Sequence, residues 1–512
     1  MSKIKSLILG SAAGLVAIAG AQAADLPVKA KAVQYVKICS LYGAGFYYMP
    51  GTDTCIKFGG YVQLDATIHG SAHHQPAWNN TANVGQENRT SDQFVSRVRA
   101  QFNVDTRTAT EYGVVRTYWA SNFQHTSGDG PSSGVLTTDL AFIQFAGFTF
   151  GKAISGFQTP WGANPVGLNT SNLLGGYDNS TGINQIAYTW QFGNGLSAQL
   201  GVEDNKVINR APVFNASASF TGTAAPAASG AYLGSGTLLA AQNGTGGQLS
   251  PDIVGNMRYD SSAFTAQISA ATNNVNGTYY ATGAGAIGTE FSGHPNDTWG
   301  FAVAGGIQIK NLPTGPGDKL SLDFTYTDGA PKYVIGGTTG NAFNSFQEGA
   351  VNAGSYQSFA SVNLYDGVYA NGGQIEKTKA WGFRGGYEHN WTKEWQTSVF
   401  GSYSRIDYNA NASTAICVRQ AQAATANVGG FANGYSCNPD FNIWQVGSRT
   451  AWTPVRNLTF SGEVLYTFID QANTGSLVSG TANSIGAFKP AATYDYKDQG
   501  VLSGNMRVRR TF

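Results

Sequence analysis

An alternation of apolar and polar side chains in residues 56–69 constrains the fold of this chain more than any other feature. Val62 and Leu64 belong to the apolar set, and Gln63 and Asp65 belong to the polar set. A period of two places these sets on opposite faces of a β-strand. The same period returns up to the C-terminus, with almost no helical periodicity between its occurrences. We therefore predict an all-β chain.

The composition decides between a soluble sandwich and a barrel in a membrane. Charged residues make up 12% of the chain, about half of the roughly 25% that is usual in globular proteins. Outside the N-terminus, no apolar run reaches the roughly 18 residues of a transmembrane helix. The mean hydropathy is slightly polar at -0.18, as expected when only every second residue faces lipid. The pattern predicts a transmembrane antiparallel β-barrel, and the near-neutral charge gives no reason to expect a nucleic-acid partner.

The first 23 residues have the pattern of a cleaved signal peptide. Lys3 and Lys5 precede an apolar segment, and Ala23 ends a small-residue cleavage site. Removing residues 1–23 takes away two of the 31 Lys and Arg and none of the 30 Asp and Glu, so the mature chain carries a net charge of −1. The following residues, 24–55, are predicted to form a periplasmic segment that starts as a flexible tail. A second hypothesis makes Ala24 an attachment point for the peptidoglycan of the cell wall.

The cysteines form two local pairs in the sequence. Export permits disulfides, and four cysteines allow three pairings. The simplest pairing joins Cys39 to Cys55 and Cys417 to Cys437. The first bond would brace a periplasmic hairpin that turns at residues 49–52, and the second would staple a long external loop. Four unpaired thiols are the alternative.

Sixteen candidate strands follow from the alternation, an even number as a single-chain bacterial barrel requires. Short connections such as 192–195 alternate with long ones such as 205–250, 328–376 and 409–441. In such barrels the short turns are periplasmic and the long loops are external. The sequence leaves the conformation of 205–250 and 328–376 open. We expect the strands near 56–69, 94–104, 113–123, two stretches that end with 141–152, 184–191, 196–203, 252–259, 264–270, 299–309, 319–327, 377–389, 396–408, 442–451, 458–468 and 501–512.

Three stretches of the chain resemble the general porins of alphaproteobacteria. They are CSLYGAGFYYMPGTDTCIKFGGYVQLD at 39–65, AFIQFAGFTFGK at 141–152 and the terminal Phe512. The resemblance implies a sixteen-stranded outer-membrane barrel at 56–512, usually a homotrimer, whose third external loop at 154–182 folds into the pore. It also implies passive diffusion of small hydrophilic solutes and ions. The C-terminal aromatic resembles the signal read by the barrel assembly machinery, and outer-membrane lipid with lipopolysaccharide would surround the wall.

Basic residues on the polar faces of the strands are the candidate site. Arg97 and Arg99 lie on one such face, where each would cost roughly 2 to 4 kcal/mol if it pointed into lipid. We expect the early-strand arginines to face Asp178 of the inward loop across a constriction and to give weak anion preference or near neutrality. The alternative is that these bases pair with acids in the wall. The candidate pore-lining residues are Lys57, Arg97, Arg99, Arg116, Lys152, Asp178, Arg384, Arg507 and Arg509, and the inward acids are Asp65, Glu203, Asp323, Glu388 and Glu463.

Other function classes find less support. The six histidines lack metal-ligand spacing, and there is no G-x-S-x-G, phosphate-binding glycine loop or C-x-x-C. We therefore expect no catalytic site, cofactor or metal. A substrate-specific channel for sugars or organic acids is one alternative, suggested by aromatics such as Trp119 and Trp161. A surface adhesin or receptor that displays its long loops is another.

Overall fold

The computed structural model describes most of the chain in two compact units, Met1–Ile56 and Lys57–Phe512, which we describe separately. The predicted signal peptide (1–23) and Ala24 lie outside the described residues. The described residues are 37–70, 89, 92–161, 173–177, 181–204, 211–217, 244–282, 288–336, 342–347, 358–427, 429–480 and 489–512.

The first unit contains a disulfide-braced hairpin. The short strand β1 (Tyr47–Tyr48) pairs with the beginning of β2 (Thr54–Ile68), after the 3-10 helix η1 (Ser40–Tyr42). The Thr52 amide donates to the Met49 carbonyl at 3.1 Å, which confirms the predicted turn at 49–52. Cys39 and Cys55 form a disulfide whose sulfurs are buried. The first predicted pairing is thus confirmed.

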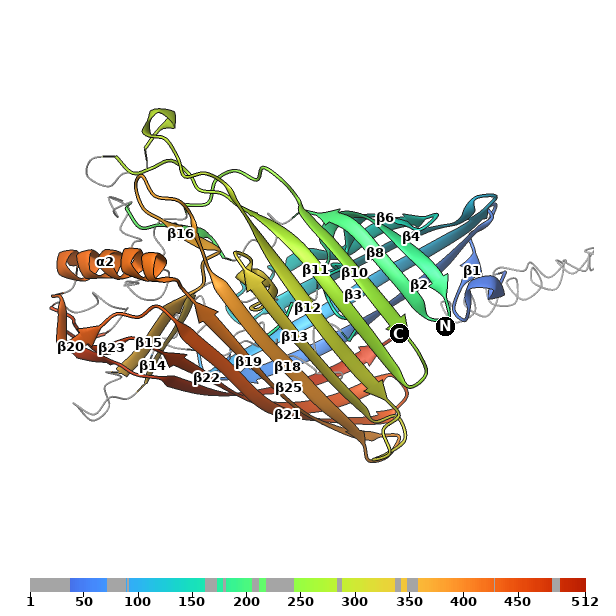
Figure 1. The fold of residues 1–512 in the computed structure, drawn as a ribbon. Coiled ribbons are helices and arrows are strands. Elements are labelled where there is room, and N and C mark those ends of the chain that lie inside the picture. The colour runs from blue at the N-terminus through green and yellow to red at the C-terminus, as the bar shows by residue number, and fades with distance from the viewer. Residues whose placement is uncertain are drawn as a thin grey trace, which may run out of the picture. The chain divides into compact units, whose positions relative to one another are not determined.

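Sixteen strands of the described chain form one closed antiparallel barrel (Figure 1). Each strand pairs with the next around the wall, and β25 returns to β2 in a register that runs from Tyr61 opposite Thr511 to Ile68 opposite Gly504. Closure leaves no unpaired strand edge in the hydrocarbon. The predicted strand number is confirmed. The strands are β2 (Thr54–Ile68), β3 (Phe94–Thr110), β4 (Gly113–Thr126), β5 (Val135–Phe145), β6 (Phe148–Ala153), β7 (Ile183–Gly193), β8 (Leu196–Glu203), β10 (Asp252–Asp260), β11 (Phe264–Val275), β12 (Thr298–Lys310), β13 (Lys319–Asp328), β18 (Lys379–Asn390), β19 (Trp395–Asp407), β21 (Phe441–Val455), β22 (Leu458–Gln471) and β25 (Gln499–Thr511).

The wall is apolar outside and polar inside. On β2, Val62 is 50% exposed and Leu64 47%, whereas Gln63 and Asp65 between them are at most 2% exposed. Apolar exposure on this scale suits a surface that faces lipid, because alternate residues of a transmembrane strand point to lipid and lumen. The predicted facing of this strand is confirmed. Among the described residues, none of the helices is both long and apolar enough to span a membrane.

The connections are short at one end of the barrel and long at the other. The β5–β6 hairpin turns at Ala146 and Gly147, both at positive φ, as the tightest hairpin turns require. The β7–β8 hairpin turns in the same way at Asn194 and Gly195. The long connections follow β2, β6, β8, β11, β13, β19 and β22. The expected asymmetry between short and long connections is present.

The long connections build a structured layer with a hydrophobic core of its own. A five-stranded sheet joins β14 (Ala342–Gln347), β15 (Ser358–Asn363), β24 (Thr493–Tyr496), β23 (Thr474–Val478) and β20 (Phe431–Ser436). A three-stranded sheet joins β9 (Val213–Asn215), β16 (Gly367–Tyr369) and β17 (Glu376–Lys377). Phe343, Phe346 and Phe359 are at most 1% exposed in the shared core. The described parts of 205–250 and 328–376, which the sequence left open, therefore contain packed strands.

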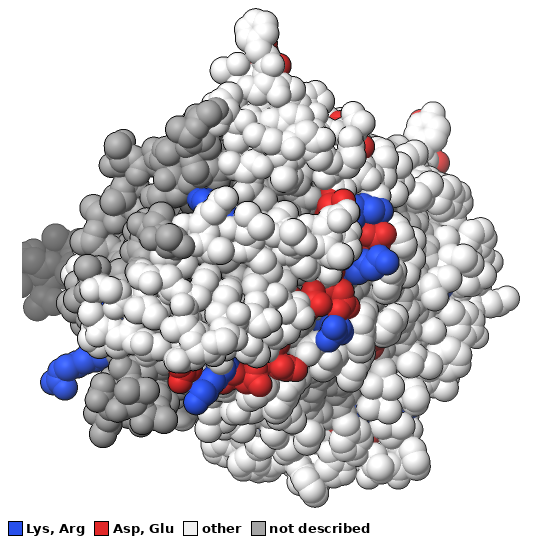
Figure 2. All heavy atoms as spheres, turned by 60° about the vertical axis from the view of Figure 1, so that its left-hand side comes forward, with Lys and Arg blue, Asp and Glu red and all other residues white. Residues whose placement is uncertain are grey.

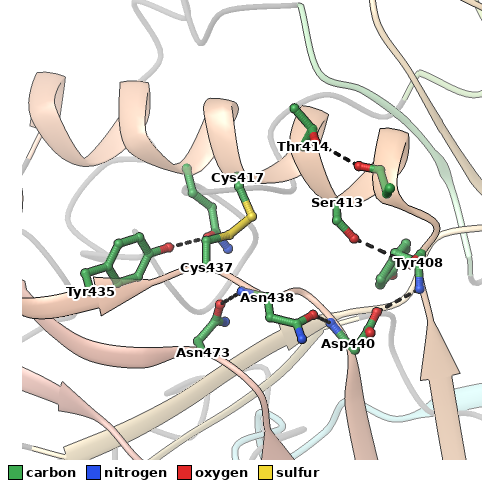
Figure 3. Close-up of a disulfide and its surroundings, with 11 residues drawn as sticks. Tyr408, Ser413, Thr414, Cys417, Tyr435, Cys437, Asn438, Asp440 and Asn473 are labelled. Atoms are coloured by element: carbon green, nitrogen blue, oxygen red, sulfur yellow. Dashed lines mark hydrogen bonds between the residues drawn. A yellow bond between two sulfur atoms is a disulfide. The ribbon is translucent and has the colours of Figure 1, made fainter.

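A helix occupies the connection between β19 and β21, where the sequence predicted only a loop. Helix α2 (Ala410–Asn427) is tied to the chain after β20 by the disulfide between Cys417 and Cys437, so the second predicted pairing is confirmed (Figure 3). Beside the disulfide, the Tyr435 hydroxyl donates to Gln420 Oε1 at 2.7 Å. The external loop is therefore stapled to a helix.

The face that carries the long connections shows acidic and basic side chains lying next to one another (Figure 2). Ion pairs at this end include Lys377 with Asp328 at 3.2 Å and Arg405 with Asp407 at 2.7 Å. Paired charges largely cancel each other, so these four residues add little net charge to this end of the barrel.

Candidate functional site: the inward loop and the arginine patch

The connection between β6 and β7, which we call the inward loop (154–182), has described parts that lie against the inner wall. Its described parts are 154–161, 173–177 and 181–182. Phe157, Leu173 and Tyr177 are at most 4% exposed, although they belong to a connection and not to the wall. Ser155 and Gly156 also hydrogen-bond to Glu203, and the Leu173 carbonyl accepts from Arg384, and both partners point inward from strands of the wall. The described parts therefore fold inward, and Asp178 lies outside the described residues.

The first part of the inward loop is held by polar side chains from three wall strands. Glu203 on β8 accepts from the Ser155 hydroxyl at 2.8 Å and from the Gly156 amide at 2.9 Å. Asn256 on β10 donates to the Gly156 carbonyl at 2.6 Å. Gln267 on β11 donates to the Gln158 carbonyl, further along the loop, at 2.9 Å. These bonds satisfy backbone groups that a buried loop could not leave unpaired.

The second part of the loop is held by a buried ion pair. Arg384 on β18 contacts Asp323 on β13 at 2.9 Å and is 1% exposed. Its other guanidinium nitrogens donate to the carbonyls of Leu173 at 3.3 Å and Tyr177 at 3.0 Å. Asp323 also accepts from the Thr159 hydroxyl at 3.1 Å. Arg384, predicted as pore-lining, is thus placed behind the loop, where it joins two loop segments to the wall.

Glycines allow the loop to approach the wall closely. Gly175 has a φ of 95°, a conformation that side chains other than glycine rarely adopt. A Cβ atom on Gly382 of β18 would lie 2.7 Å from the Gly175 Cα atom. A Cβ atom on Gly306 of β12 would lie 2.6 Å from the Trp161 ring. Trp161, a candidate sugar contact in the sequence, is 9% exposed and packs into the wall instead.

A buried lysine connects the inward loop to the connection after β13. Lys332 in η7 (Pro331–Tyr333) is 3% exposed and contacts Asp252 of β10 at 2.7 Å. The Tyr333 ring packs 4.4 Å from Phe157 of the inward loop, and its hydroxyl donates to Asp252 at 2.8 Å. Burial raises the pKa of the nearby Asp366 to about 7, while Lys332 acts in the opposite direction. This network joins the inward loop to the layer of long connections.

Arginines gather on three adjacent strands, β3, β2 and β25. Arg97 and Arg507 share one carboxylate, Asp65, at 2.9 Å and 2.6 Å. Arg99 donates instead to an amide, Gln124 Oε1, at 2.7 Å, and Arg509 donates to the amide of Gln63 at 2.6 Å. We call Arg97, Arg99, Arg507 and Arg509 the arginine patch. The side chains that hold the inward loop, which we call the loop anchors, lie on other strands than the arginine patch, namely β8, β10, β11, β13, β18 and β21. In this order they are Glu203, Asn256, Gln267, Asp323, Arg384 and Gln445.

The remaining predicted residues are distributed along the wall. Arg116 pairs with Asp105 at 3.0 Å, and Lys152 donates to the Thr138 carbonyl. Lys57 is exposed near the start of β2. The inward acids Glu388 and Glu463 are at most 5% exposed.

Several residues that lie at this site were not among those predicted from the sequence. Arg449 on β21 is 8% exposed and points inward, which the odd-numbered parity of its strand would have revealed. Lys332 follows β13 in a connection without periodicity, so no pattern marked it. Gln445, which accepts from the Leu174 amide at 2.8 Å, is an uncharged inward residue like many others.

A closed antiparallel cylinder with an apolar exterior, a polar interior and a loop folded against the inner wall defines the transmembrane β-barrels of outer membranes. Within this class, a family model described as "Porin subfamily" matches residues 25–505, so the chain belongs to this porin family. The resemblance to alphaproteobacterial porins is thereby confirmed, together with an outer-membrane location.

Two curated relatives and one solved structure extend this comparison. Porin Omp2a of Brucella canis is 37% identical over 220 residues, which cover 39% of this chain and 56% of the relative. Porin Omp2b of Brucella suis is 34% identical over 214 residues, which cover 39% of this chain and 52% of the relative. The matches thus span about half the length of these relatives. The outer membrane channel DcaP of Acinetobacter baumannii is similar in fold, with a TM-score of 0.55 and 13% identity over 91% of this chain and 99% of that one.

Proposed function

We propose that this protein forms a water-filled channel for passive diffusion of small hydrophilic solutes and ions across the outer membrane, with weak selectivity from the arginine patch. The observation that carries the proposal is the charge imbalance in this patch. Arg97 and Arg507 share the carboxylate of Asp65, whereas Arg99 and Arg509 donate to the side-chain amides of Gln124 and Gln63. A channel discriminates between ions through the fixed charges at its narrow part.

The selectivity should be weak and should favour anions. Arg97 and Arg507 are already engaged by Asp65 and are at most 6% exposed, so Arg99 and Arg509 supply most of the field in the lumen. Salt at 0.1 M screens such charges over about 10 Å. The mature chain has a net charge of −1, so no strong excess of either sign adds to the local field. The constriction itself would lie between the arginine patch and the inward loop.

Reversal potentials across a planar bilayer in a KCl gradient test this proposal. We expect a small potential of the anion-selective sign for the native chain. Replacing Arg99 and Arg509 together by Gln should move the potential towards cation selectivity. Arg510→Gln is the matched control, because Arg510 is an exposed residue on the opposite face of the same strand. Strong cation selectivity of the native chain, or equal shifts for the control, would contradict the assignment.

Assembly follows the same proposal. We expect a homotrimer embedded in outer-membrane lipid and lipopolysaccharide, with barrel insertion guided by the C-terminal Phe512. The backbone of Phe512 pairs with Gly60 of β2 at 3.0 Å and 3.2 Å, and its side chain is 61% exposed. Light scattering of the detergent complex measures the subunit number. Mass spectrometry of the mature chain tests cleavage after residue 23, and a wall-linked peptide that begins at Ala24 would support attachment to peptidoglycan.

A further inference from the structure

A polar recess lies between the first part of the inward loop and the wall, away from the arginine patch. Its volume is about 580 Å³.

 A separate apolar groove of about 790 Å³ lies on the lipid-facing side of the wall, beside Leu200 and Phe301, and is not part of the recess. The recess lies in the lumen, because its wall residues have the inward parity of β7, β8, β10 and β11. They are Thr189, Gln191, Ser197, Gln199, Asn256, Arg258, Asp260 and Gln267, and the loop contributes residues from Ile154 to Pro160.

Several side chains of the recess are available to a solute. Asn256 and Gln267 are partly used, because they hold the inward loop. Among the described residues, no protein group hydrogen-bonds to the side chains of Thr189, Gln191 and Ser197. They lie close together, since Gln191 is opposite Ser197 and Thr189 is opposite Gln199 in the β7–β8 register. Hydroxyl and amide groups both donate and accept hydrogen bonds.

The described residues that line the recess carry no net charge. Among them, the one base, Arg258, contacts the one acid, Asp260, at 2.6 Å. Asp260 also accepts from the Thr265 hydroxyl at 2.8 Å. An ion would gain little in such a site, because the two charges are already paired. A neutral solute with hydroxyl groups matches the lining in charge, because both are neutral, and in hydrogen bonding, because both donate and accept.

We propose that this recess binds a neutral, hydroxyl-rich solute, of the chemical class of sugars and polyols, during its passage through the channel. The inference rests on the proposed channel function and adds a substrate class to it. The recess opens towards the short-turn end, since Gly195 belongs to the β7–β8 turn and Asp260 is the last residue of β10. A volume of about 580 Å³ falls within the range of about 300 to 1,000 Å³ that is usual for small-molecule sites.

Ion current through single channels, recorded with increasing maltose in constant KCl, tests the proposal. We expect the current noise to rise and saturate with maltose concentration, because each bound molecule obstructs the lumen for its residence time. The variant with Thr189→Val, Gln191→Leu and Ser197→Ala should raise the half-saturating concentration by about tenfold or more, as expected for the loss of several neutral hydrogen bonds. Glycine betaine, which has no hydroxyl group, should produce no saturating noise.

Two controls separate this inference from the channel function. Thr450→Val removes a hydroxyl from the outer face of β21 and should leave the maltose response unchanged. The more conservative variant Gln191→Asn should keep most of the response. Normal ion current without saturating maltose noise, or equal responses of the native chain and the triple variant, would overturn the recess assignment while leaving the channel intact. Absence of any ion current would instead overturn the channel function itself.

Discussion

Removal of the Arg384 guanidinium should detach the second part of the inward loop from the wall. The guanidinium is 1% exposed and holds Asp323 together with the carbonyls of Leu173 and Tyr177. Arg384→Ala would leave the Asp323 carboxylate buried with the Thr159 hydroxyl as its remaining loop contact. Breaking one side of a buried ion pair costs roughly 3 to 5 kcal/mol. This corresponds to a factor of about 10² to more than 10³ in the equilibrium between attached and detached loop.

Hydrogen exchange measures this detachment directly. The Leu174 amide donates to Gln445 and the Gly175 amide donates to the Val334 carbonyl, so both report on attachment. In Arg384→Ala these amides should lose protection by roughly the factor above, while the strands of the wall keep theirs. Single-channel current should become noisier as the loop moves in the lumen. Arg405→Ala is the matched control, because its partner Asp407 is partly exposed and such surface pairs contribute about 0 to 1 kcal/mol.

A double variant shows whether the uncompensated charge is the cause. Arg384→Met with Asp323→Leu removes both charges and keeps apolar volume at the site. Replacing a buried pair by apolar side chains is often neutral or stabilising, so this variant should protect the Leu174 amide better than Arg384→Ala does. Equal loss of protection in both variants would refute the electrostatic reasoning. Unchanged protection in Arg384→Ala would show that the other contacts hold the loop without this pair.

Two further predictions concern the layer of long connections. Burial raises the pKa of Asp366 to about 7, above the value near 3.9 of an unfolded chain, so its contribution to loop stability is full below about pH 4 and is lost as the pH rises through 7. The variant Asp366→Asn should therefore become more stable than the native chain as the pH rises from 4 to 8, by up to about 4 kcal/mol. Hydrogen exchange of the Thr378 amide measures this gain, because that amide donates to the Asp366 carbonyl. A gain that does not change with pH would contradict this origin. Replacing Cys417 and Cys437 by Ala removes a disulfide that closes a loop of 20 residues, and such a bond stabilises the folded loop by roughly 3 kcal/mol. The buried Arg419 of α2 should then become accessible to trypsin, while the melting temperature of the barrel stays the same. Loss of the barrel itself would show that the external disulfide is needed for its assembly.

The strands could be predicted from the sequence because lipid and lumen impose the same alternation on every strand. On β2, the parity of Leu64 and Asp65 was enough to assign their faces, and the same holds for Arg97 and Arg99 on β3. Parity states only that a side chain points inward, however. It does not tell whether the inward loop covers that side chain, and for this reason Arg384 and Arg507 looked alike in the sequence.

The loop anchors and the external helix carried weaker signals. Asn256, Gln267 and Gln445 hold the inward loop through their uncharged side-chain amides. Amide side chains are equally expected on any part of a barrel wall that faces water, so nothing in the sequence distinguishes these three. Their role depends on backbone carbonyls and amides of the loop, and a sequence does not show where these groups lie. The helix α2 was more accessible to prediction. Its segment is rich in alanine and glutamine, both good helix formers, but the barrel periodicity on either side favoured a loop.

The placement of anchors and arginines on different strands has a functional consequence. The loop is held by β8, β10, β11, β13, β18 and β21, whereas the arginine patch lies on β3, β2 and β25. The loop contacts of Arg384 and the amide contacts of Arg99 have no residue in common. Because effects at sites without shared partners usually add, the selectivity shift of the Arg99 and Arg509 variant should persist when Arg384 and Asp323 are also replaced. If the shift disappears in the combined variant, the attached loop must alter the electric field at Arg99 and Arg509. Ion selectivity would then depend on the position of the inward loop as well as on the charge of these arginines.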